Sequence, residues 1–556
     1  MSKFSTGLER AAVASIAFAA IVQLASPLLI HILGYDAFHA LMWIEAFPRI
    51  LRAGTWYPHW LPDAFGGLGS STFYFYPPLA FFIITPFRLL LRGISPEAIY
   101  HIAAFAMTLA SIFSMRYWLS VLQAKRMLAW FGSLLYAFSP YHFDVLYVRS
   151  GPAEHLAFVW APLIFAGIFL ILRDGNPARG FLLLAVSWGL MLLSHVPAAV
   201  TTGIAALVVV LAPIRRMNWP RFSLIALAVL LGTLLAAFYL LPVAHFSPYA
   251  QLQYLRVTRQ GLEDPFVSLL DVLHGHNLTV KGIAIVHYLA LLTTTIVLLS
   301  LWKKENPNQP LIRTLALVGL ADLFFQNAGI SRPVWDALHL TQIVQFSWRW
   351  NLLSSLLAGS VYATIQNARA RNWINGSIIL LALAACVAGV FQDFDLRVNP
   401  HSLQRTPFDP PEYAPVWANQ NKDSVVQFAL VHQGDSFAED TLGHALPTRM
   451  REQEPNEIRF QLSTAAPVTI VLHHWYWPSW TLQNLSTGRP IAQQPRPDGR
   501  ASFTLPPGSN EIEYHLGTTG SETAGVMLSL AALLIIATVT FRMARNKDTS
   551  SIRPGW

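Results

Sequence analysis

The sequence has a single cysteine, Cys386, and few charged residues for its length. One cysteine excludes an internal disulfide and a metal site built from several cysteines. Charged residues make up 12% of the 556 residues, whereas soluble proteins carry about 25%. The sequence also has no Walker loop, no dinucleotide-binding glycine fingerprint, no His-Glu-x-x-His motif and no nucleophile elbow. It therefore gives no support to the nucleotide-driven chemistry of soluble enzymes.

Long apolar runs take the place of the missing charges. Hydrophobic residues make up 54% of the chain, and the mean hydropathy is +0.42. Several runs of roughly 18 or more apolar residues are long enough to cross a bilayer, which indicates a polytopic α-helical membrane protein. The net charge of +8 comes from short basic clusters between these runs. Such clusters are typical of cytoplasmic loops, so no nucleic-acid partner is expected.

The basic clusters also predict the topology. If all of them face the cytoplasm, the apolar runs alternate between them and both termini are cytoplasmic. The first run has no convincing cleavage site and is expected to remain as a helix. The twelve expected spans are 11–33, 98–121, 127–146, 155–172, 180–196, 197–213, 222–244, 283–302, 311–330, 350–367, 374–392 and 523–541.

Residues 34–97 form an expected outer loop of a transmembrane domain that covers 1–392. Within this loop, the apolar segment 78–91 contains Pro86 and Arg88. Its 14 residues would reach only about 21 Å as a helix, less than the ~30 Å hydrocarbon core. We therefore predict an interfacial helix at this segment.

The polar stretch 393–522 is expected to form a small β-sandwich outside the membrane. Its first part is rich in proline, and segments typical of strands follow at 468–475, 500–505 and 511–516. Segments rich in proline and glycine separate these strands. The last span and a cytoplasmic tail follow in 523–556.

Asp36 follows the first apolar run, where a membrane helix would emerge into water. An acid at this boundary is costly and is a candidate functional residue. The alternative is an acid that caps a helix end.

Further polar residues lie at the expected outer ends of the spans. Arg149 and Glu154 share one short turn, where they line a cavity or form a structural salt bridge. His195 interrupts an apolar stretch, as a ligand-binding residue or a helix end. Arg349 stands between two tryptophans, as a phosphate-binding cation or an interfacial anchor. His274-Gly-His276 is a weak metal signal in a loop.

The aromatic outer loop resembles a known family. Asp36 and His39 precede two further motifs, and this arrangement is similar to the first outer loop of bacterial GT-C membrane glycosyltransferases. The nearest subgroup is labelled "6-pyruvoyl-tetrahydropterin synthase-related" membrane proteins. The motifs that carry the resemblance are Gly54-Thr-Trp-Tyr57-Pro58-His-Trp60-Leu-Pro62-Asp63, Phe73-Tyr-Phe-Tyr76-Pro77-Pro78 and, near the C-terminus, Trp475-Tyr-Trp-Pro-Ser-Trp480.

The resemblance implies a transferase that uses a polyprenyl-phosphate sugar at the outer face of the membrane, with Asp36 as the catalytic base. The implied reaction inverts the anomeric centre. Many relatives carry a second acid beside the first, but this chain has Tyr35-Asp36-Ala37. The absence of this second acid argues against a metal site built from a carboxylate pair and leaves Asp36 to act more nearly alone. A divalent cation such as Mg or Mn is the one cofactor considered, and the sequence does not decide whether it is used.

Cations are needed for the departing phosphate, and Arg149 and Arg349 are the candidates. The remaining expected substrate-binding residues are His39, Tyr57, Trp60, Tyr76, Glu154 and His195. The expected partners are the polyprenyl-linked donor, membrane lipids and an envelope glycan, lipid or protein acceptor. The expected location is the bacterial inner membrane.

Two alternatives remain open at the sequence level. A transporter or flippase for lipid-linked glycans would share the cavity and the outer cations, but it should carry ionisable residues near mid-span and related halves. Asp322 is the main mid-span charge, and no internal repeat is evident. A non-catalytic envelope assembly protein would instead present the β-domain.

Overall fold

The computed structural model describes residues 3–29, 34, 36–173, 176–212, 218–252, 278–302, 309–365, 370, 372–381, 409–418, 425, 428–429, 431–432 and 435–550. Three features of the sequence lie outside these residues: Cys386, the His274-Gly-His276 pair and the second half of the expected span 374–392.

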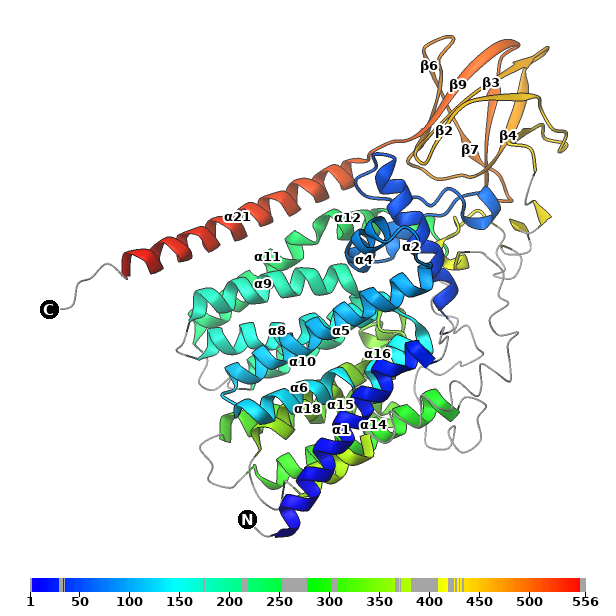
Figure 1. The fold of residues 1–556 in the computed structure, drawn as a ribbon. Coiled ribbons are helices and arrows are strands. Elements are labelled where there is room, and N and C mark those ends of the chain that lie inside the picture. Colours follow the sequence, from blue (N-terminus) through cyan, green and yellow to red (C-terminus); the bar gives the residue numbers. More distant parts are fainter. Residues whose placement is uncertain are drawn as a thin grey trace.

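The chain is mostly helical, with a β-rich region near its C-terminus (Figure 1). This coarse architecture agrees with the sequence prediction. The described helices of the bundle are α1 (Lys3–Leu29), α5 (Pro96–Val121), α6 (Arg126–Ala137), α7 (Pro140–Phe143), α8 (Pro152–Leu172), α9 (Pro177–Ser194), α10 (Val196–Leu211), α11 (Trp219–Leu235), α12 (Ala237–Phe246), α14 (Leu278–Ser300), α15 (Gln309–Gln326), α16 (Ala328–Ala337), α17 (Leu340–Ile343) and α18 (Asn351–Thr364). The last helix is α21 (Gly520–Ser550).

Fewer helices than expected are long enough to cross a membrane alone. Among the described residues, four pass by length and composition: α5, α8, α9 and residues 520–543 of α21. Two bent pairs raise the number to six, because α11 and α12 meet at 69° and α15 and α16 at 85°. The expected count of twelve is thus not confirmed. Apolar composition marks a segment as buried in lipid or protein but does not show where its helix bends.

Glycines let neighbouring helices approach closely. A Cβ atom added to Gly189 on α9 would lie 2.7 Å from the carbonyl oxygen of Gly232 on α11. A Cβ atom on Gly180 of α9 would lie equally close, at 2.7 Å, to the carbonyl oxygen of Gly167 on α8. Small residues are the usual means of helix contact in membranes. These contacts hold α8, α9 and α11 together.

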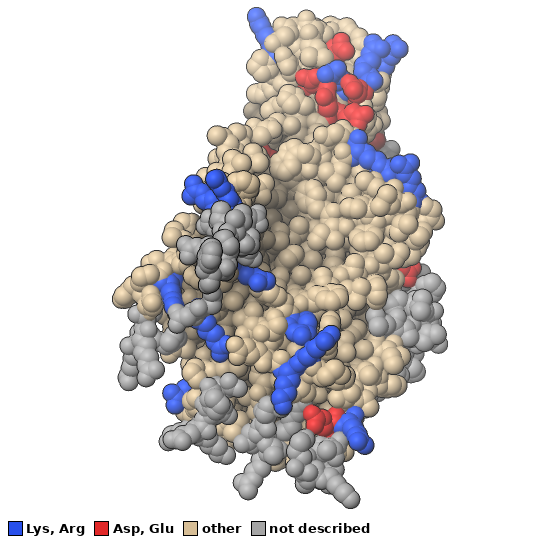
Figure 2. All heavy atoms as spheres, turned by 60° about the vertical axis from the view of Figure 1, so that its left-hand side comes forward, with Lys and Arg blue, Asp and Glu red and all other residues tan. Residues whose placement is uncertain are grey.

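Basic residues gather at one end of the bundle. Arg126 begins α6, Arg173 follows α8, and Arg179, Arg221 and Arg313 lie in or near the first turns of α9, α11 and α15. Figure 2 looks toward this end and shows scattered Lys and Arg with few acids, while Asp and Glu gather on the β-rich region. This distribution is the one expected for a cytoplasmic face.

The outer loop folds into short helices at the junction of the two parts (Figure 1). They are α2 (Ala37–Arg52), η1 (Ala64–Gly67), α3 (Thr72–Phe75) and α4 (Leu79–Leu90). The helix expected at 78–91 is therefore present as α4. No bounds were predicted for a second helix in this loop. Helix α2 is amphipathic, too short to span a bilayer and interrupted by Pro48. It buries one face, including Trp43, Ile44 and Phe47.

The β-rich region has two antiparallel sheets, in the orders β1-β4-β8-β7 and β2-β3-β9-β5-β6. The three strands expected from the sequence are β4, β8 and β9. The full set is β1 (Ala438–Glu439), β2 (Thr448–Glu454), β3 (Glu457–Thr464), β4 (Val468–Trp475), β5 (Trp480–Asn484), β6 (Arg489–Ile491), β7 (Gln494–Pro495), β8 (Arg500–Leu505) and β9 (Gly508–Leu516).

Both sheets contribute to one hydrophobic core, which also includes residues of the outer loop. The Trp475 N–H donates a 2.8 Å hydrogen bond to the Leu68 carbonyl oxygen, which ties β4 to the loop. A second hydrophobic core fills the helical bundle.

Candidate active site

Three side chains expected at the outer helix ends meet around a fourth, Glu154. The Glu154 side chain is 3% exposed and lies in the first turn of α8. Arg149 forms an ion pair with its Oε2 atom. His195 Nε2 and Arg349 Nε each lie 3.6 Å from that same oxygen. We call Arg149, Glu154, His195 and Arg349 the Glu154 cluster. Three separate chain segments supply it, at the end of the bundle opposite the basic helix ends.

The turn before α8 positions Arg149 and Glu154. Arg149 ends η2 (Asp144–Arg149), a π-helical turn, and Pro152 begins α8. Between them, Ser150 adopts a left-handed conformation with φ of 58°. The reversal lets two side chains five residues apart face each other. Single π-helical turns are rare, and those that occur are often found at functional sites.

Asp36 is held against this turn through its backbone. The Asp36 N–H donates to the carbonyl oxygen of Arg149 at 3.0 Å. The adjacent Gly34 N–H donates to the Ser150 hydroxyl at 2.8 Å. Asp36 occupies the N-cap position of α2, but its side chain accepts no capping hydrogen bond from that helix. It is partly exposed, and the carboxylate does not cap α2 through a hydrogen bond.

His195 stands at a break between two helices. It ends α9 and caps α10, where its Nδ1 accepts a 3.3 Å hydrogen bond from the Ala198 N–H. The break that the sequence predicted is therefore present. The fixed ring directs Nε2 toward Glu154.

Arg349 is buried in η6 (Ser347–Trp350), the turn that leads into α18. Its Nη1 donates to the Val344 carbonyl oxygen at 2.8 Å, and its guanidinium lies over the Phe346 ring, 5.4 Å from the centroid. At 6% exposure of its side chain, Arg349 is embedded in the protein rather than serving as a membrane-surface anchor.

Tyr76 lies near the charges of the cluster, and His39 lies near Asp36. Burial is the main cause of the raised pKa of Tyr76, and the next cause is the negative charge of Asp36. The two arginines of the cluster oppose this rise, so the Tyr76 hydroxyl lies among all these charges. His39 is one helical turn from Asp36 on α2 and stacks on Trp43, which also contacts Tyr76.

Tyr57 and Trp60 are not brought to the cluster. The Tyr57 hydroxyl donates to the Phe73 carbonyl oxygen inside the loop. Trp60 is 0% exposed and stacks on His474 of β4, with ring centroids 5.0 Å apart. Both rings pack within the interface between the outer loop and the β-rich region. In this arrangement neither ring has an open face for a sugar.

Two residues near the site were missed at the sequence level. The Tyr141 hydroxyl donates to Glu154 Oε1, so it completes the partners of that carboxylate. Asp409 is 1% exposed and accepts hydrogen bonds from Trp43 Nε1, at 2.8 Å, and from the Thr72 hydroxyl. Burial raises the pKa of Asp409. Only the polar segment Pro140-Tyr-His-Phe-Asp144 pointed to Tyr141. Asp409 lies in a proline-rich stretch whose sequence shows no helix or strand pattern.

The cluster is suited to bind a phosphate. Its two guanidiniums outnumber its one carboxylate, and arginine forks match phosphate oxygens. Asp36 is held against the turn of Arg149 and adds a partly exposed carboxylate. A proton acceptor has to be within reach of the hydroxyl from which it takes the proton. Among the described residues, no group of three or more His, Cys, Asp or Glu side chains is arranged to hold a metal ion.

No protein-family model matches the chain, and no curated protein is significantly similar to it. The arabinofuranosyltransferase AftD from Mycobacteria is 18% identical, with a TM-score of 0.41 over 80% of this chain and 30% of that protein. ArnT from Cupriavidus metallidurans is 13% identical in its apo state, with a TM-score of 0.35 over 76% of this chain and 84% of ArnT. ArnT bound to undecaprenyl phosphate gives 0.34, over 88% and 97%. The chain thus spans less than a third of the length of AftD. Because all three scores are low, the function proposed below depends on this chain's own residues.

Proposed function

We propose that the chain is a membrane glycosyltransferase that moves a sugar from a polyprenyl-phosphate donor to a cell-envelope acceptor. The observation that carries the proposal is the attachment of Asp36 to the turn that holds Arg149. It sets a partly exposed carboxylate beside a buried cluster with two arginines. A glycosyl transfer needs both a base for the acceptor and cations for the departing phosphate.

In the proposed reaction, the Asp36 carboxylate takes the proton of an acceptor hydroxyl. The hydroxyl oxygen then forms a bond to the anomeric carbon as the bond from that carbon to the phosphate oxygen breaks. The electron pair leaves with the polyprenyl phosphate. Arg149 and Arg349 stabilise the charge that develops on this phosphate. Attack from the face opposite the leaving group inverts the anomeric centre.

The distribution of charge supports an extracytoplasmic site. The basic residues lie at one end of the bundle (Figure 2). The Glu154 cluster lies at the other end, where α8 begins. If the basic end faces the cytoplasm, the cluster, the outer loop and the β-rich region face outward. Both termini are then cytoplasmic, as expected for an enzyme of the bacterial inner membrane that takes a lipid-linked donor.

The test compares Asp36→Asn with wild type in cells that lack the native chain. Lipid-linked sugars and surface glycans are measured by mass spectrometry. The variant should insert normally, lose one glycan and accumulate its polyprenyl-linked precursor. Asp336→Asn is the matched control, because Asp336 is an exposed carboxylate on α16. Unchanged glycans in the Asp36→Asn cells would overturn the assignment of Asp36 as base.

The same experiment separates the alternatives. A flippase would leave the precursor on the cytoplasmic side of the membrane, where externally added modifying enzymes cannot reach it, whereas a blocked transferase leaves it accessible. The mid-helix acid Asp322 accepts hydrogen bonds from Gln326 at 2.8 Å and Ser354 at 2.7 Å. These bonds account for it as a helix-packing residue, so no observation here favours transport.

A further inference from the structure

A separate cavity lies at the far end of α2, away from the Glu154 cluster. Four arginines line it: Arg49 and Arg52 from the last turn of α2, Arg88 from α4, and Arg92 just beyond α4. We call this the arginine pocket. Its volume is about 470 Å³. Along the helix axis, Arg52 is about 24 Å from Asp36 at 1.5 Å per residue, so the two sites are separate.

Two of the arginines are paired within the pocket. Arg88 binds both carboxylate oxygens of Glu45, at 2.7 and 2.9 Å, and so fastens α4 to α2. Arg49 pairs with Asp63 at the surface. These two pairs have a structural role that accounts for their presence.

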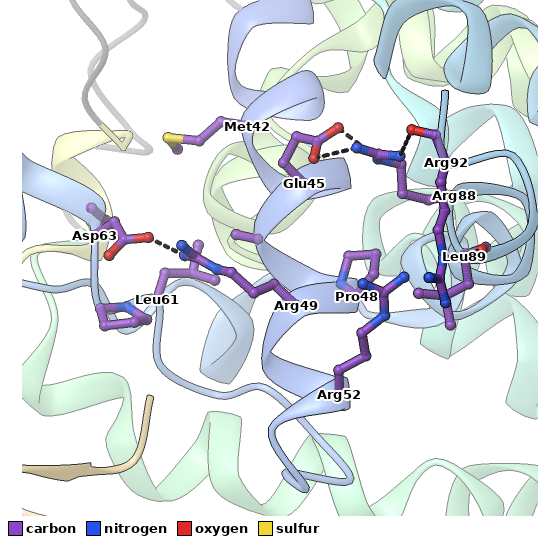
Figure 3. Close-up of a pocket in the computed structure, with 13 residues that line it drawn as sticks. Met42, Glu45, Pro48, Arg49, Arg52, Leu61, Asp63, Arg88, Leu89 and Arg92 are labelled. Atoms are coloured by element: carbon purple, nitrogen blue, oxygen red, sulfur yellow. Dashed lines mark hydrogen bonds and ion pairs between the residues drawn. The ribbon is translucent and has the colours of Figure 1, made fainter. Parts of the chain in front are cut away.

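The other two arginines have no acidic partner among the described residues. Arg52 and Arg92 are exposed, and the Arg92 Nε donates only to the Leu89 carbonyl oxygen, at 3.3 Å. In Figure 3 their side chains extend toward the same part of the pocket, beside Pro48 and Leu89, while the carboxylates lie at its sides. Four arginines and two carboxylates leave a net charge of +2. A pocket with this charge favours an anion.

Apolar side chains at neighbouring sequence positions indicate what kind of anion the pocket binds. Leu90 at the end of α4 is 81% exposed, and Trp56 and Ile94 nearby in sequence are 58% and 37% exposed. A soluble anion would leave these leucine and tryptophan side chains exposed to water. Arginine beside exposed apolar residues on an amphipathic helix is typical of the membrane interface.

We propose that the arginine pocket binds the phosphate headgroup of an anionic membrane lipid, with the lipid chain along Leu89 and Leu90. Arg52 and Arg92 contact the phosphate, because each guanidinium can give two parallel hydrogen bonds to its oxygens. A phospholipid and a polyprenyl phosphate share this chemistry. The site does not depend on the proposed transferase activity when a phospholipid fills it.

The test measures lipid binding to the purified full-length protein by native mass spectrometry. Phosphatidylglycerol, undecaprenyl phosphate and zwitterionic phosphatidylcholine are added separately to wild type and to the double variant Arg52→Gln/Arg92→Gln. The variant should bind the anionic lipid about tenfold more weakly or worse, given the usual contribution of each interfacial arginine. Arg449→Gln/Arg489→Gln is the control, because it removes the same charge from exposed strands of the β-rich region.

Competition identifies the lipid. The comparison uses only the binding that the Arg52→Gln/Arg92→Gln variant loses, because the Glu154 cluster is itself proposed to hold a polyprenyl phosphate. If phosphatidylglycerol displaces this part of the bound undecaprenyl phosphate at equal concentration, the occupant is a phospholipid; the reverse result indicates the polyprenyl lipid. Arg52→Lys/Arg92→Lys should keep part of the affinity, because a point charge remains. The proposal is overturned if the glutamine variant, with an unchanged melting temperature, binds as wild type does, or if the control loses as much affinity. Asp36→Asn should bind normally, so a failed transferase assignment would not affect this result.

Discussion

The backbone N–H of Asp36 donates to the carbonyl oxygen of Arg149 at 3.0 Å, although the two residues lie in different parts of the sequence. The bond joins the start of an outer-loop helix to the turn that holds the cluster's first cation. The backbone therefore sets the position of the proposed base relative to Arg149, one of the two arginines proposed to bind phosphate. Small changes in this turn should affect turnover more than stability.

Ser150→Ala is expected to reduce turnover. The variant removes the hydroxyl that accepts the hydrogen bond from Gly34, so a buried N–H loses its partner and Asp36 loses one of its two anchors. We expect the free energy of unfolding to fall by about 1 kcal/mol and glycosyl transfer to fall about tenfold. Turnover and thermal unfolding of the purified protein measure the two effects.

The control for Ser150 is Ser120→Ala, which removes an exposed hydroxyl that bonds only to its own helix. A loss of stability in Ser150→Ala without a loss of turnover would contradict a role for this turn in placing Asp36.

Glu154→Gln is expected to destabilise the protein strongly. The variant removes the only carboxylate of the cluster and leaves Arg149 and Arg349 buried without their shared partner. Breaking a buried pair on one side costs about 3–5 kcal/mol. Thermal unfolding in detergent should show a large fall in melting temperature, whereas Asp336→Asn should change little.

A double variant distinguishes loss of charge from loss of packing. Arg149→Met/Glu154→Gln should be more stable than the sum of the single variants predicts, because the unpaired charge is reduced. Additive single effects would show that the ion pair itself contributes nothing.

Gly69→Ala is expected to separate the outer loop from the β-rich region. Gly69 has φ of +85°, and an added Cβ atom would lie 2.4 Å from the Trp60 indole. The substitution therefore adds backbone strain and a steric clash with a fully buried ring. We expect a loss of about 2–4 kcal/mol and faster proteolysis of the β-rich region.

Gly54→Ala provides the matched comparison. Gly54 has a similar φ of +94°, but no atom lies within 4 Å of its added Cβ. It should lose only the cost of the backbone strain, about 1 kcal/mol. Equal losses in the two variants would show that the Trp60 contact is unimportant.

Acidification is expected to weaken the same interface. Burial lowers the pKa of His59 in the loop and of His474 in β4 to about 3, from an ordinary value of 6.5. Between these values the unfolded chain binds protons that the folded chain does not, so stability falls as the pH drops below 6.5. At pH 5 each histidine contributes a loss of about 2 kcal/mol. The titratable groups that face them are Glu522, Tyr57 and Tyr74 at His59, and His473 and Tyr514 at His474.

Melting temperatures between pH 7.5 and 5 measure this effect. His474→Gln should reduce the slope with pH, whereas His444→Gln should not, because the His444 side chain is 73% exposed. Identical slopes in wild type and His474→Gln would contradict the prediction.

Segments with one dominant physical signal could be predicted from the sequence. Segment 468–475 is rich in β-branched residues, segment 500–505 alternates, and His195 with Pro197 marks a helix break; all three elements are present. Segment 78–91 was too short to span, and α4 is a helix of 12 residues. In each case local composition alone determines the element.

Other features depend on contacts between distant segments. Segment 222–244 was expected to be one span, but the chain bends by 69° near Ala236, where no proline or charge marks the bend. Arg349 was identified as a candidate, yet its approach to Glu154 depends on how η6 packs against α10 and α15. Trp60 looked like a sugar-binding ring because its partner, His474, is over four hundred residues away.

The core shared by the outer loop and the two sheets makes the β-rich region inseparable from the rest of the chain. Trp475, Trp477 and Trp480 are buried, and each contacts an aromatic ring of the outer loop. Tyr74 of the loop also donates to Glu522 at the start of α21, at 3.3 Å. An excised fragment would expose three tryptophans to water and should aggregate. For the same reason the two sheets do not move independently of the bundle. A tilt of the β-rich region would also move the outer loop and the first residues of α2.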